Sequence, residues 1–340
     1  MKTSTSPGSL WDTWGITAIL VLLLAVAPVL TPDFFSLENV QSVLRESAYL
    51  GIVAAGMTFA IASGAFDLSV GGQLALCSVV SLIGFAAGGT ALAIVAAVAT
   101  GLACGLINAS LITRLSVPPF VATLGTLFVF RGVSYILTQD GPKTLPYEQI
   151  DSPFVKIGRL NVAGVPVPFV IMLGVFAAAW LLLRRTGTGR RVLAYGSSPE
   201  AARFCGISAT RLRFFVFGLV GMSVGVATLT YITRVWTADG SAQDGFELKV
   251  IAAVVLGGTS LKGGKATLIG TFSAVLLINV LNDMLVSEGV ASAYQRIVLG
   301  GVLIVALTID GLRTRFAAPG SLRRAVSGLG VRTPQPGSVR

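Results

Sequence analysis

Asp67 is the most unusual polar residue of this chain because of what surrounds it. It lies in the stretch SGAFDLSVGG (63–72), which follows the apolar run YLGIVAAGMTFAIA and precedes the apolar run QLALCSVVSLIGFAAG. A carboxylate and several glycines between two such runs indicate a helix that stops and restarts. We expect Asp67 to be the N-cap of the second helix, with its charge at the positive end of the helix dipole.

The remaining residue types offer little catalytic chemistry. The chain has no histidine, and its cysteines (Cys77, Cys104 and Cys205) lie too far apart for a metal site or a structural disulfide. The stretch GGTSLKGGK is not a phosphate-binding loop, because Lys265 is followed by Ala266 and not by serine or threonine. We therefore expect no cofactor, no metal and no ATP site. Without paired carboxylates or a nucleophile constellation, an enzyme is also disfavoured.

The composition is that of a membrane protein. Of the residues, 54% are hydrophobic and only 12% are charged, and the mean hydropathy is +0.82, whereas soluble domains carry about 25% charged residues. A net charge of +10 would suggest nucleic acid in a soluble protein, but in a membrane protein its distribution matters more. The sequence predicts an all-α polytopic protein in a lipid bilayer, without a nucleic acid partner.

Ten apolar segments of roughly spanning length follow one another along the chain. They lie near 14–30, 47–64, 66–88, 90–112, 118–138, 167–183, 211–233, 248–261, 266–286 and 294–310. With ten spans and both termini cytoplasmic, about two thirds of the Lys and Arg residues fall on the inside, as the positive-inside rule requires. The eighth segment is too short to cross a core of about 30 Å unless the chain around it is broken.

These segments divide the chain into three parts. Residues 1–13 form a cytoplasmic N-terminal segment and residues 14–310 form the transmembrane domain. Residues 311–340 form a cytoplasmic tail, and its Pro, Gly, Ser and Arg content predicts disorder.

Two connections within the transmembrane domain are long. The outside connection, the periplasmic loop 139–168, is rich in Pro and Gly and contains a short amphipathic piece near Phe154–Leu160. The inside connection, the cytoplasmic loop 184–211, is strongly basic.

The inside loop contains the signals of a short helix. Ser198 is a suitable N-cap, Pro199 suits the first helical position, Glu200 lies in the first turn and Gly206 lies where a helix would stop. Such a helix is either a plain surface element or a docking element for a cytoplasmic protein.

The inside loop also carries a family resemblance. The stretch RRVLAYGSSPEAARFCGISATRLRFFVFGLVGM resembles the loop of the inner-membrane permeases of bacterial ABC sugar importers, the ribose, xylose and galactose group. Three further stretches resemble the same family in the same order: GMTFAIASGAFDLSVGGQLAL, PPFVATLGTLFVFRGVSYILT and VIAAVVLGGTSLKGGKATLIGT. The resemblance extends from about Leu37 to Asp310. One departure is SGAFD (63–67), where the family often has Ser-Gly-Gly-Ile-Asp.

The resemblance implies a mechanism and a set of partners. The permease would form the path for a sugar delivered by a periplasmic or lipid-anchored binding protein, which meets loop 139–168 and residues 234–249. A separate ATP-binding subunit, with two fused nucleotide-binding domains, would drive the transport. A second permease copy or a related chain would complete a homodimer or heterodimer in the inner membrane.

The short helix would then be the coupling helix that enters a cleft of the ATPase. The small side chains of Ala201 and Ala202 would let it lie close in that cleft. The resemblance assigns to this element Pro199, Glu200, Ala201, Ala202, Arg203, Gly206 and Ile207.

Polar residues within the predicted spans are candidates for the solute path, since intramembrane polar groups usually face a bundle interior or a cavity. The alternative is that they bond neighbouring helices together. We expect Arg131 either to snorkel to the membrane surface or to pair with a carboxylate near a helix end. We expect the small-residue patterns GLACG (101–105) and GMSVG (221–225) to pack helices. The candidates for the path are Asp67, Ser69, Asn108, Thr123, Thr126 and Asn279.

Other functions remain open at this point. Related ABC permeases import nucleosides or branched-chain amino acids, and their broken helices look alike. An ion-coupled secondary transporter also uses broken helices, but it would normally carry more buried carboxylates or a histidine, and it would not need a helix at 199–206. A channel is a third possibility.

Overall fold

The computed structural model describes residues 7–145, 147–149, 151–298, 300, 301, 304 and 308, with side chains from Trp14 onward. Within this part, the regular secondary structure is helical apart from strands of two residues each, which confirms the predicted all-α class. The helices are α1 (Pro7–Leu30), α2 (Leu37–Ala62), α3 (Val70–Arg114), α4 (Pro119–Thr138), α5 (Pro153–Arg159), α6 (Val167–Arg185), α7 (Gly187–Ser197), α8 (Pro199–Phe204), α9 (Ala209–Val235), α10 (Phe246–Leu256) and α11 (Leu268–Ser287). The strands are β1 (Lys143–Thr144), β2 (Asn161–Val162), β3 (Val165–Pro166) and β4 (Thr237–Ala238), and a 3₁₀ turn covers Tyr147–Gln149.

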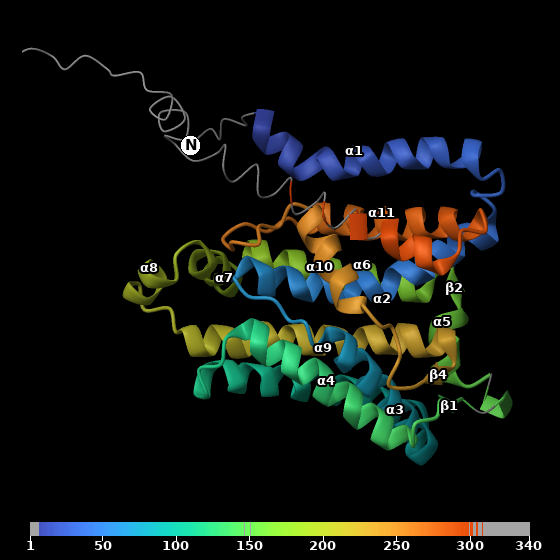
Figure 1. The fold of residues 1–340 in the computed structure, drawn as a ribbon, viewed down its shortest axis with the longest axis horizontal. Helices are drawn as coiled ribbons and strands as arrows, with labels where there is room; N and C mark the ends of the chain where they lie inside the picture. The colour runs from blue at the N-terminus through green and yellow to red at the C-terminus, as the bar shows by residue number, and fades with distance from the viewer. Residues whose placement is uncertain are drawn as a thin grey trace, which may run out of the picture.

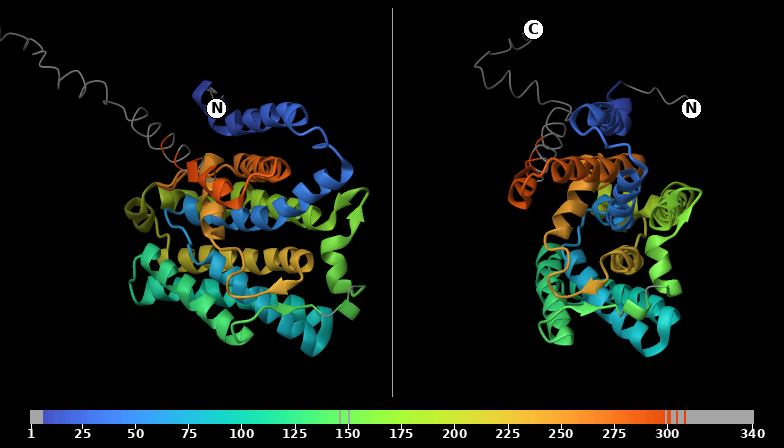
Figure 2. Two further views of the ribbon diagram at one scale, coloured as in Figure 1. Left: turned by 45° about the vertical axis from the view of Figure 1, so that its right-hand side comes forward. Right: turned by 90° about the vertical axis from the view of Figure 1, so that its right-hand side faces the viewer.

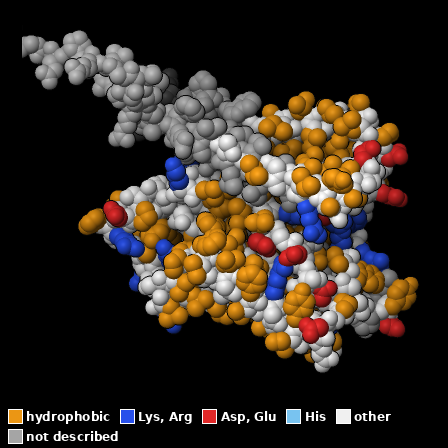
Figure 3. All heavy atoms as spheres, viewed as in Figure 1, with side chains coloured by type: hydrophobic (Ala, Val, Ile, Leu, Met, Phe, Trp, Pro, Cys, Tyr) orange, Lys and Arg blue, Asp and Glu red, His pale blue; other side chains and the backbone are white. Residues whose placement is uncertain are grey.

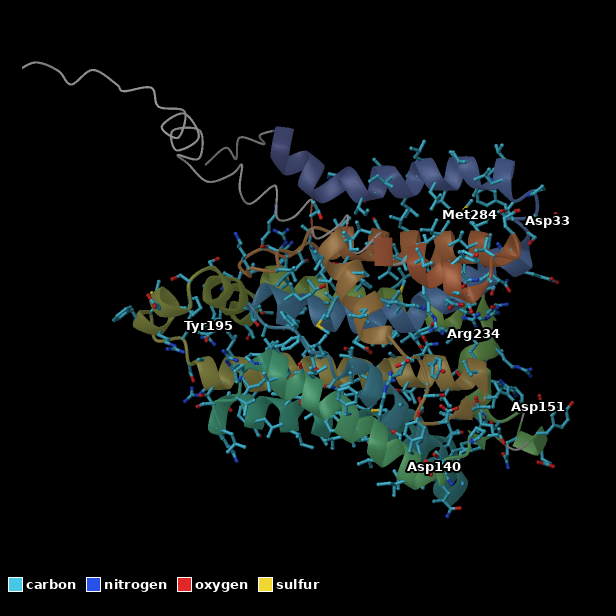
Figure 4. The ribbon with its side chains drawn as sticks, in the orientation of Figure 1. Asp33, Asp140, Asp151, Tyr195, Arg234 and Met284 are labelled. Carbon is cyan, nitrogen blue, oxygen red and sulfur yellow. The ribbon has the colours of Figure 1, made fainter. Side chains whose placement is uncertain are left out.

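The long helices lie side by side with their axes roughly aligned (Figures 1 and 2). Helices α1 and α11 form one side, α2, α6 and α10 the middle, and α9, α3 and α4 the other side. Helices α7 and α8 lie at one end of the bundle, called here the α8 end; α5 and the short strands lie at the opposite end, the α5 end. Figure 4 places Tyr195 of α7 at the α8 end and Arg234, Asp140 and Asp151 toward the α5 end.

In the part of the chain that the structure describes, five helices, α3, α4, α6, α9 and α11, are long and apolar enough to cross a membrane. Their side chains include many exposed large hydrophobic residues, such as Val95 and Ile136, which a lipid environment accommodates. The chain is therefore a multi-pass membrane protein. Helix α10, with 11 residues, is only about 16 Å long, which agrees with the broken eighth segment.

Helix α3 combines two of the predicted segments. Its 45 residues are kinked where Gly88 and Gly89 leave helical geometry, and Gly89 has φ +69°, which favours glycine. The two arms on either side correspond to the predicted segments 66–88 and 90–112. The first arm begins at Val70, however, so residues 64–69 belong to the break and not to the span.

The ends of the chain differ in part from the prediction. Helix α1 begins at Pro7, so the predicted segment 1–13 is partly helical. At the tenth predicted segment, 294–310, residues 292–298 are helical and most of the rest lies outside the described residues. The tail 311–340 also lies outside them.

The long outside loop is partly ordered by backbone pairing. The predicted piece near Phe154–Leu160 is α5, and β2 and β3 form a hairpin after it. Strand β1 pairs antiparallel with β4, with Lys143 opposite Ala238. The loop 139–168 is thereby joined to the segment that precedes α10.

Helices α3 and α9 approach each other through glycine, which confirms the packing role of both small-residue patterns. A Cβ at Gly101 would overlap the carbonyl oxygen of Gly221, and a Cβ at Gly105 would overlap that of Phe217. A Cβ at Gly225 would lie 2.7 Å from the carbonyl oxygen of Ala97. Backbone-to-backbone contact of this kind is how membrane helices gain van der Waals contact.

We predict that Gly101→Ala destabilises the protein. The added methyl group would force α3 and α9 apart, and overpacking of this kind typically costs about 1–3 kcal/mol. In an open helical position the same change would be neutral or stabilising, because alanine has the higher helix propensity. Thermal unfolding in detergent measures the difference.

Gly174→Ala in α6 is the matched control, since nothing lies within 4 Å of a Cβ at that position. If both variants unfolded at the same temperature as the native chain, the close packing of α3 on α9 would not contribute to stability.

Candidate functional site

The break between α2 and α3 is closed by Asp67 and Ser69. The carboxylate oxygen Oδ1 of Asp67 accepts hydrogen bonds from the backbone N–H of Ser69 at 2.8 Å and from the Ser69 hydroxyl at 2.5 Å. The N-cap position of α3 is occupied by Ser69, so the prediction that Asp67 is the N-cap is wrong. The Asp67 side chain instead turns the chain two residues before the helix, as aspartate commonly does in turns.

The same carboxylate binds residues from both arms of α3 and is linked to α4 through Asn108. The side-chain amide of Gln73 donates to Oδ2 of Asp67 at 3.0 Å, and the amide of Asn108 donates to Oδ2 at 3.2 Å and to the Ser69 hydroxyl at 2.8 Å. The hydroxyl of Thr126 in α4 donates to the side-chain oxygen Oδ1 of Asn108 at 2.7 Å. Asp67, Ser69, Gln73, Asn108 and Thr126 are called here the Asp67 cluster.

Four of the six predicted path residues therefore meet in one place. The Asp67 carboxylate is 0% exposed, as are Ser69 and Asn108. In this conformation the Asp67 cluster connects the break to both arms of α3 and to α4, and it is closed to solvent. That arrangement suits the helix-bonding alternative, and contact with solute stays a prediction.

The other two predicted path residues lie elsewhere. Thr123 is one turn before Thr126, where its hydroxyl donates to the backbone carbonyl of Pro119 at 2.9 Å. Asn279 of α11 lines a cavity of about 140 Å³, whose other polar wall residues include Lys249 and Gln295.

Of the two expected roles of Arg131 in α4, the structure shows pairing with a carboxylate. Arg131 forms an ion pair with Asp244, in the segment that leads into α10. Glu247, in the first turn of α10, lies close by, since both it and Arg131 approach Gly71. The sequence analysis did not single out Glu247, although an acidic residue at the start of a short apolar segment is a signal of a buried polar site.

The short helix of the inside loop is α8, and its termini follow the predicted signals. The Ser198 hydroxyl accepts from the N–H of Ala201 at 3.3 Å, and Pro199 is the first helical residue. The helix ends with Gly206 at φ +78°, and the N–H of Ile207 bonds back to the carbonyl of Ala202 at 3.0 Å.

The two faces of α8 differ from the expectation in one respect. Ala202 is buried against the rest of the chain and Ile207 is partly buried, whereas the other predicted docking residues are exposed: Pro199, Glu200, Ala201, Arg203 and Gly206. Phe204 is 93% exposed, which the sequence analysis missed. Aromatic residues are enriched at the cores of protein interfaces, so Phe204 is a candidate anchor for docking.

Helix α7, which the sequence analysis did not predict, connects α8 to both breaks in the bundle. At its end, a Cβ on Gly196 would overlap the carbonyl oxygen of Ala62, the last residue of α2. The N–H of Gly264, in the break between α10 and α11, donates to that same carbonyl at 2.9 Å. A Cβ on Gly263 would lie 3.0 Å from the N of Gly64. These five residues, with Gly196 at the centre, are called here the glycine junction.

Comparison with known proteins shows to which family this chain belongs. Residues 39–307 match the family described as branched-chain amino acid transport system / permease component. The chain belongs to this family. No solved structure matches the chain at a significant level.

Several curated relatives cover nearly the whole permease. It is 39% identical to a ribose import permease protein of Bacillus subtilis over 86% of this chain and 90% of the relative. It is 36% identical to a ribose import permease protein of Escherichia coli K12 over 86% and 91%. It is 34% identical to an L-arabinose ABC transporter permease protein of Azospirillum brasilense over 88% and 87%.

Family membership confirms the general interpretation of the sequence. The protein is the transmembrane permease subunit of an ABC importer, located in the inner membrane. It is a transport subunit and not an enzyme, and the hydrolysis of ATP belongs to a separate subunit. A substrate-binding protein is the other partner that this class of importer requires.

We predict that Asp67→Ala destabilises the permease by about 1–3 kcal/mol, because buried N–H and O–H donors in the Asp67 cluster lose their acceptor. Thermal unfolding in detergent is the measurement. Asp33→Ala is the matched control, since Asp33 is exposed (Figure 4). Equal unfolding temperatures for Asp67→Ala and the native chain would show that the break is a passive turn.

Proposed function

We propose that this permease imports a sugar, most specifically a pentose such as ribose. The observation that carries the proposal is the 39% identity to a ribose import permease over 90% of that protein's length. The arabinose permease relative supports the same chemical class. The sequence form DLSVG (67–71) after the first break agrees with the sugar branch of the family.

The proposed topology has ten spans and both termini in the cytoplasm. With α3 counted as two arms, α1 to α4, α6 and α9 to α11 match the first nine predicted segments. The α8 end carries most of the basic loop 184–211, which supports a cytoplasmic location for that end. Helix α1 starts toward the same end in Figure 1, which agrees with a cytoplasmic N-terminus.

At the α8 end, the proposed partner is an ATPase with two fused nucleotide-binding domains that serves a pair of permease subunits. The surface offered to it combines Phe204, Glu200 and Arg203 on α8. Next to α8, a hollow lined by Arg191, Arg211 and Ile207 adds positive charge. A partner with an apolar pocket and an acidic rim fits this surface.

At the α5 end, the proposed partner is the extracytoplasmic sugar-binding protein. The β1–β4 pairing joins loop 139–168 to the segment before α10. The Arg159 guanidinium lies over the ring of Trp236, 4.6 Å from its centroid, which adds a second link between the same two regions. A movement of this loop on docking of the binding protein would therefore be passed on to the segment that leads into α10.

The test is ATP-driven uptake by the reconstituted complex. The permease, its ATPase and its binding protein would be placed in proteoliposomes and offered radiolabelled D-ribose, L-arabinose, adenosine or L-leucine, each with a matching binding protein. We expect ATP-dependent uptake of a pentose. Uptake of leucine or adenosine alone would assign the permease to the amino acid or nucleoside branch, and uptake without ATP would indicate an ion-coupled transporter.

We predict that Phe204→Ala weakens binding of the ATPase at least tenfold, because exposed aromatic anchors supply much of the binding free energy of an interface. Co-purification and ATP-driven uptake measure the effect. Tyr147→Ala is the matched control: Tyr147 is also a highly exposed aromatic residue, but it follows β1, which lies at the α5 end. Equal ATPase binding by the two variants would remove Phe204 from the docking surface.

A further inference from the structure

Glu247 and Arg131 lie deep inside the membrane part of the bundle. Helix α10 ends at Leu256, and the break that follows it is held at the α8 end by the glycine junction. The helix is about 16 Å long, and in Figures 1 and 2 it runs across the long helices and not along them. Its first turn, which carries Glu247, is the lower end of α10 in Figure 1 and lies about midway between the α8 end and the α5 end, near the middle of the membrane.

Two helices begin at this depth and meet there. Gly71 is in the first turn of α3, and a Cβ at that position would overlap Oε2 of Glu247 and lie 3.3 Å from Nη2 of Arg131. Because Gly71 has no side chain, the Glu247 carboxylate and the Arg131 guanidinium can both approach the N-termini of α3 and α10.

Several polar atoms at this place have no partner. Nη1 of Arg131 pairs with Asp244, but Nε and Nη2 of Arg131 are buried without a hydrogen bond to any residue that the structure describes. Oε2 of Glu247 is likewise buried and unpartnered, and Glu247 is only 9% exposed. Buried groups of this kind are normally satisfied, so the site has both free donors and a free acceptor for an occupant.

One residue beside the site reaches the surface of the bundle. Asp244, the ion-pair partner of Arg131, is 78% exposed on its side chain. Figure 3 shows charged side chains in the middle of this otherwise largely hydrophobic face. Lipid would not accept an exposed carboxylate at that depth, so this face must border water or a second permease subunit.

From this geometry we infer that Arg131 and Glu247 form a contact site for hydroxyl groups of the transported solute. A vicinal pair of hydroxyls donates to Oε2 of Glu247 and accepts from Nε or Nη2 of Arg131, which matches the free atoms. Gly71 is a positioning residue that keeps the carboxylate in place. The inference rests on the proposed sugar import and names the residues that would recognise the sugar within the membrane.

The experiment uses the complete importer in proteoliposomes, with D-ribose as the probe. We expect Glu247→Gln and Arg131→Gln each to lower ribose uptake at least tenfold. ATPase activity stimulated by loaded binding protein should stay within twofold of the native complex, because the coupling surfaces are untouched. Gly71→Ala should lower uptake in the same way by displacing the Glu247 carboxylate.

Glu46→Gln is the matched control. Glu46 also forms an ion pair, with Arg234 at 3.0 Å, but not in this site, and its loss should leave uptake unchanged. Unfolding temperature in detergent separates recognition from folding: if the two site variants lost stability and stimulated ATPase activity together with uptake, the ion pair would be structural and the inference wrong.

The remaining outcomes distinguish this inference from the proposed function. If the native complex imports ribose and Glu247→Gln and Arg131→Gln import it equally well, the inference fails while sugar import stands. If the native complex imports leucine but no pentose, the proposed function fails, and with it the assignment of this site to hydroxyl groups.

Discussion

The architecture depends on the close backbone contact at the glycine junction. Three segments that are far apart in the sequence meet there: the end of α2, the end of α7 and the break between α10 and α11. The carbonyl of Ala62, which α2 leaves without a helical partner, accepts a hydrogen bond from Gly264. A side chain at Gly196 would prevent this approach, because its Cβ would occupy the position of that carbonyl.

The junction joins two breaks, one between α2 and α3 and one between α10 and α11. Non-helical backbone at membrane depth is tolerated only where its polar groups are satisfied by protein or water. In the first break, the Asp67 cluster supplies those partners. In the second break, the hydroxyl of Thr259 accepts from the N–H of Thr267 at 3.2 Å. Each break is thus stabilised by its own side chains as well as by contact with the other.

Much of this arrangement could be predicted from local sequence signals. The break at 63–72, the short α8 and the kink between the arms of α3 each have glycine, proline or capping residues at the required positions. Helix α7 could not be predicted, because Gly187, Gly189 and Gly196 give it a poor intrinsic propensity. It is stabilised by tertiary packing of Val192 and Tyr195, both of which are buried.

The functional details that were missed depend on tertiary contacts. The difference between Ala201 and Ala202, which are adjacent and identical in type, arises from the direction in which α8 docks on the chain. The Asp67 cluster forms because α3 brings Asn108, 41 residues away, back to the break. The position of Glu247 follows from where the junction holds the other end of α10. The pattern of residues within one segment cannot predict these contacts, because they form between segments that are far apart in the sequence.

The same contacts form a continuous mechanical connection from the α8 end to the middle of the membrane. Helix α8 is joined to α7 through Ser198, and α7 touches both breaks at Gly196. From the second break, α10 extends as a rigid rod of three turns to Glu247. A displacement of α8 by an attached subunit is therefore transmitted to the depth at which Glu247, Arg131 and Gly71 meet. Because α7 contacts the end of α2 and the second break through backbone atoms, little of that displacement would be absorbed by side chains at the glycine junction.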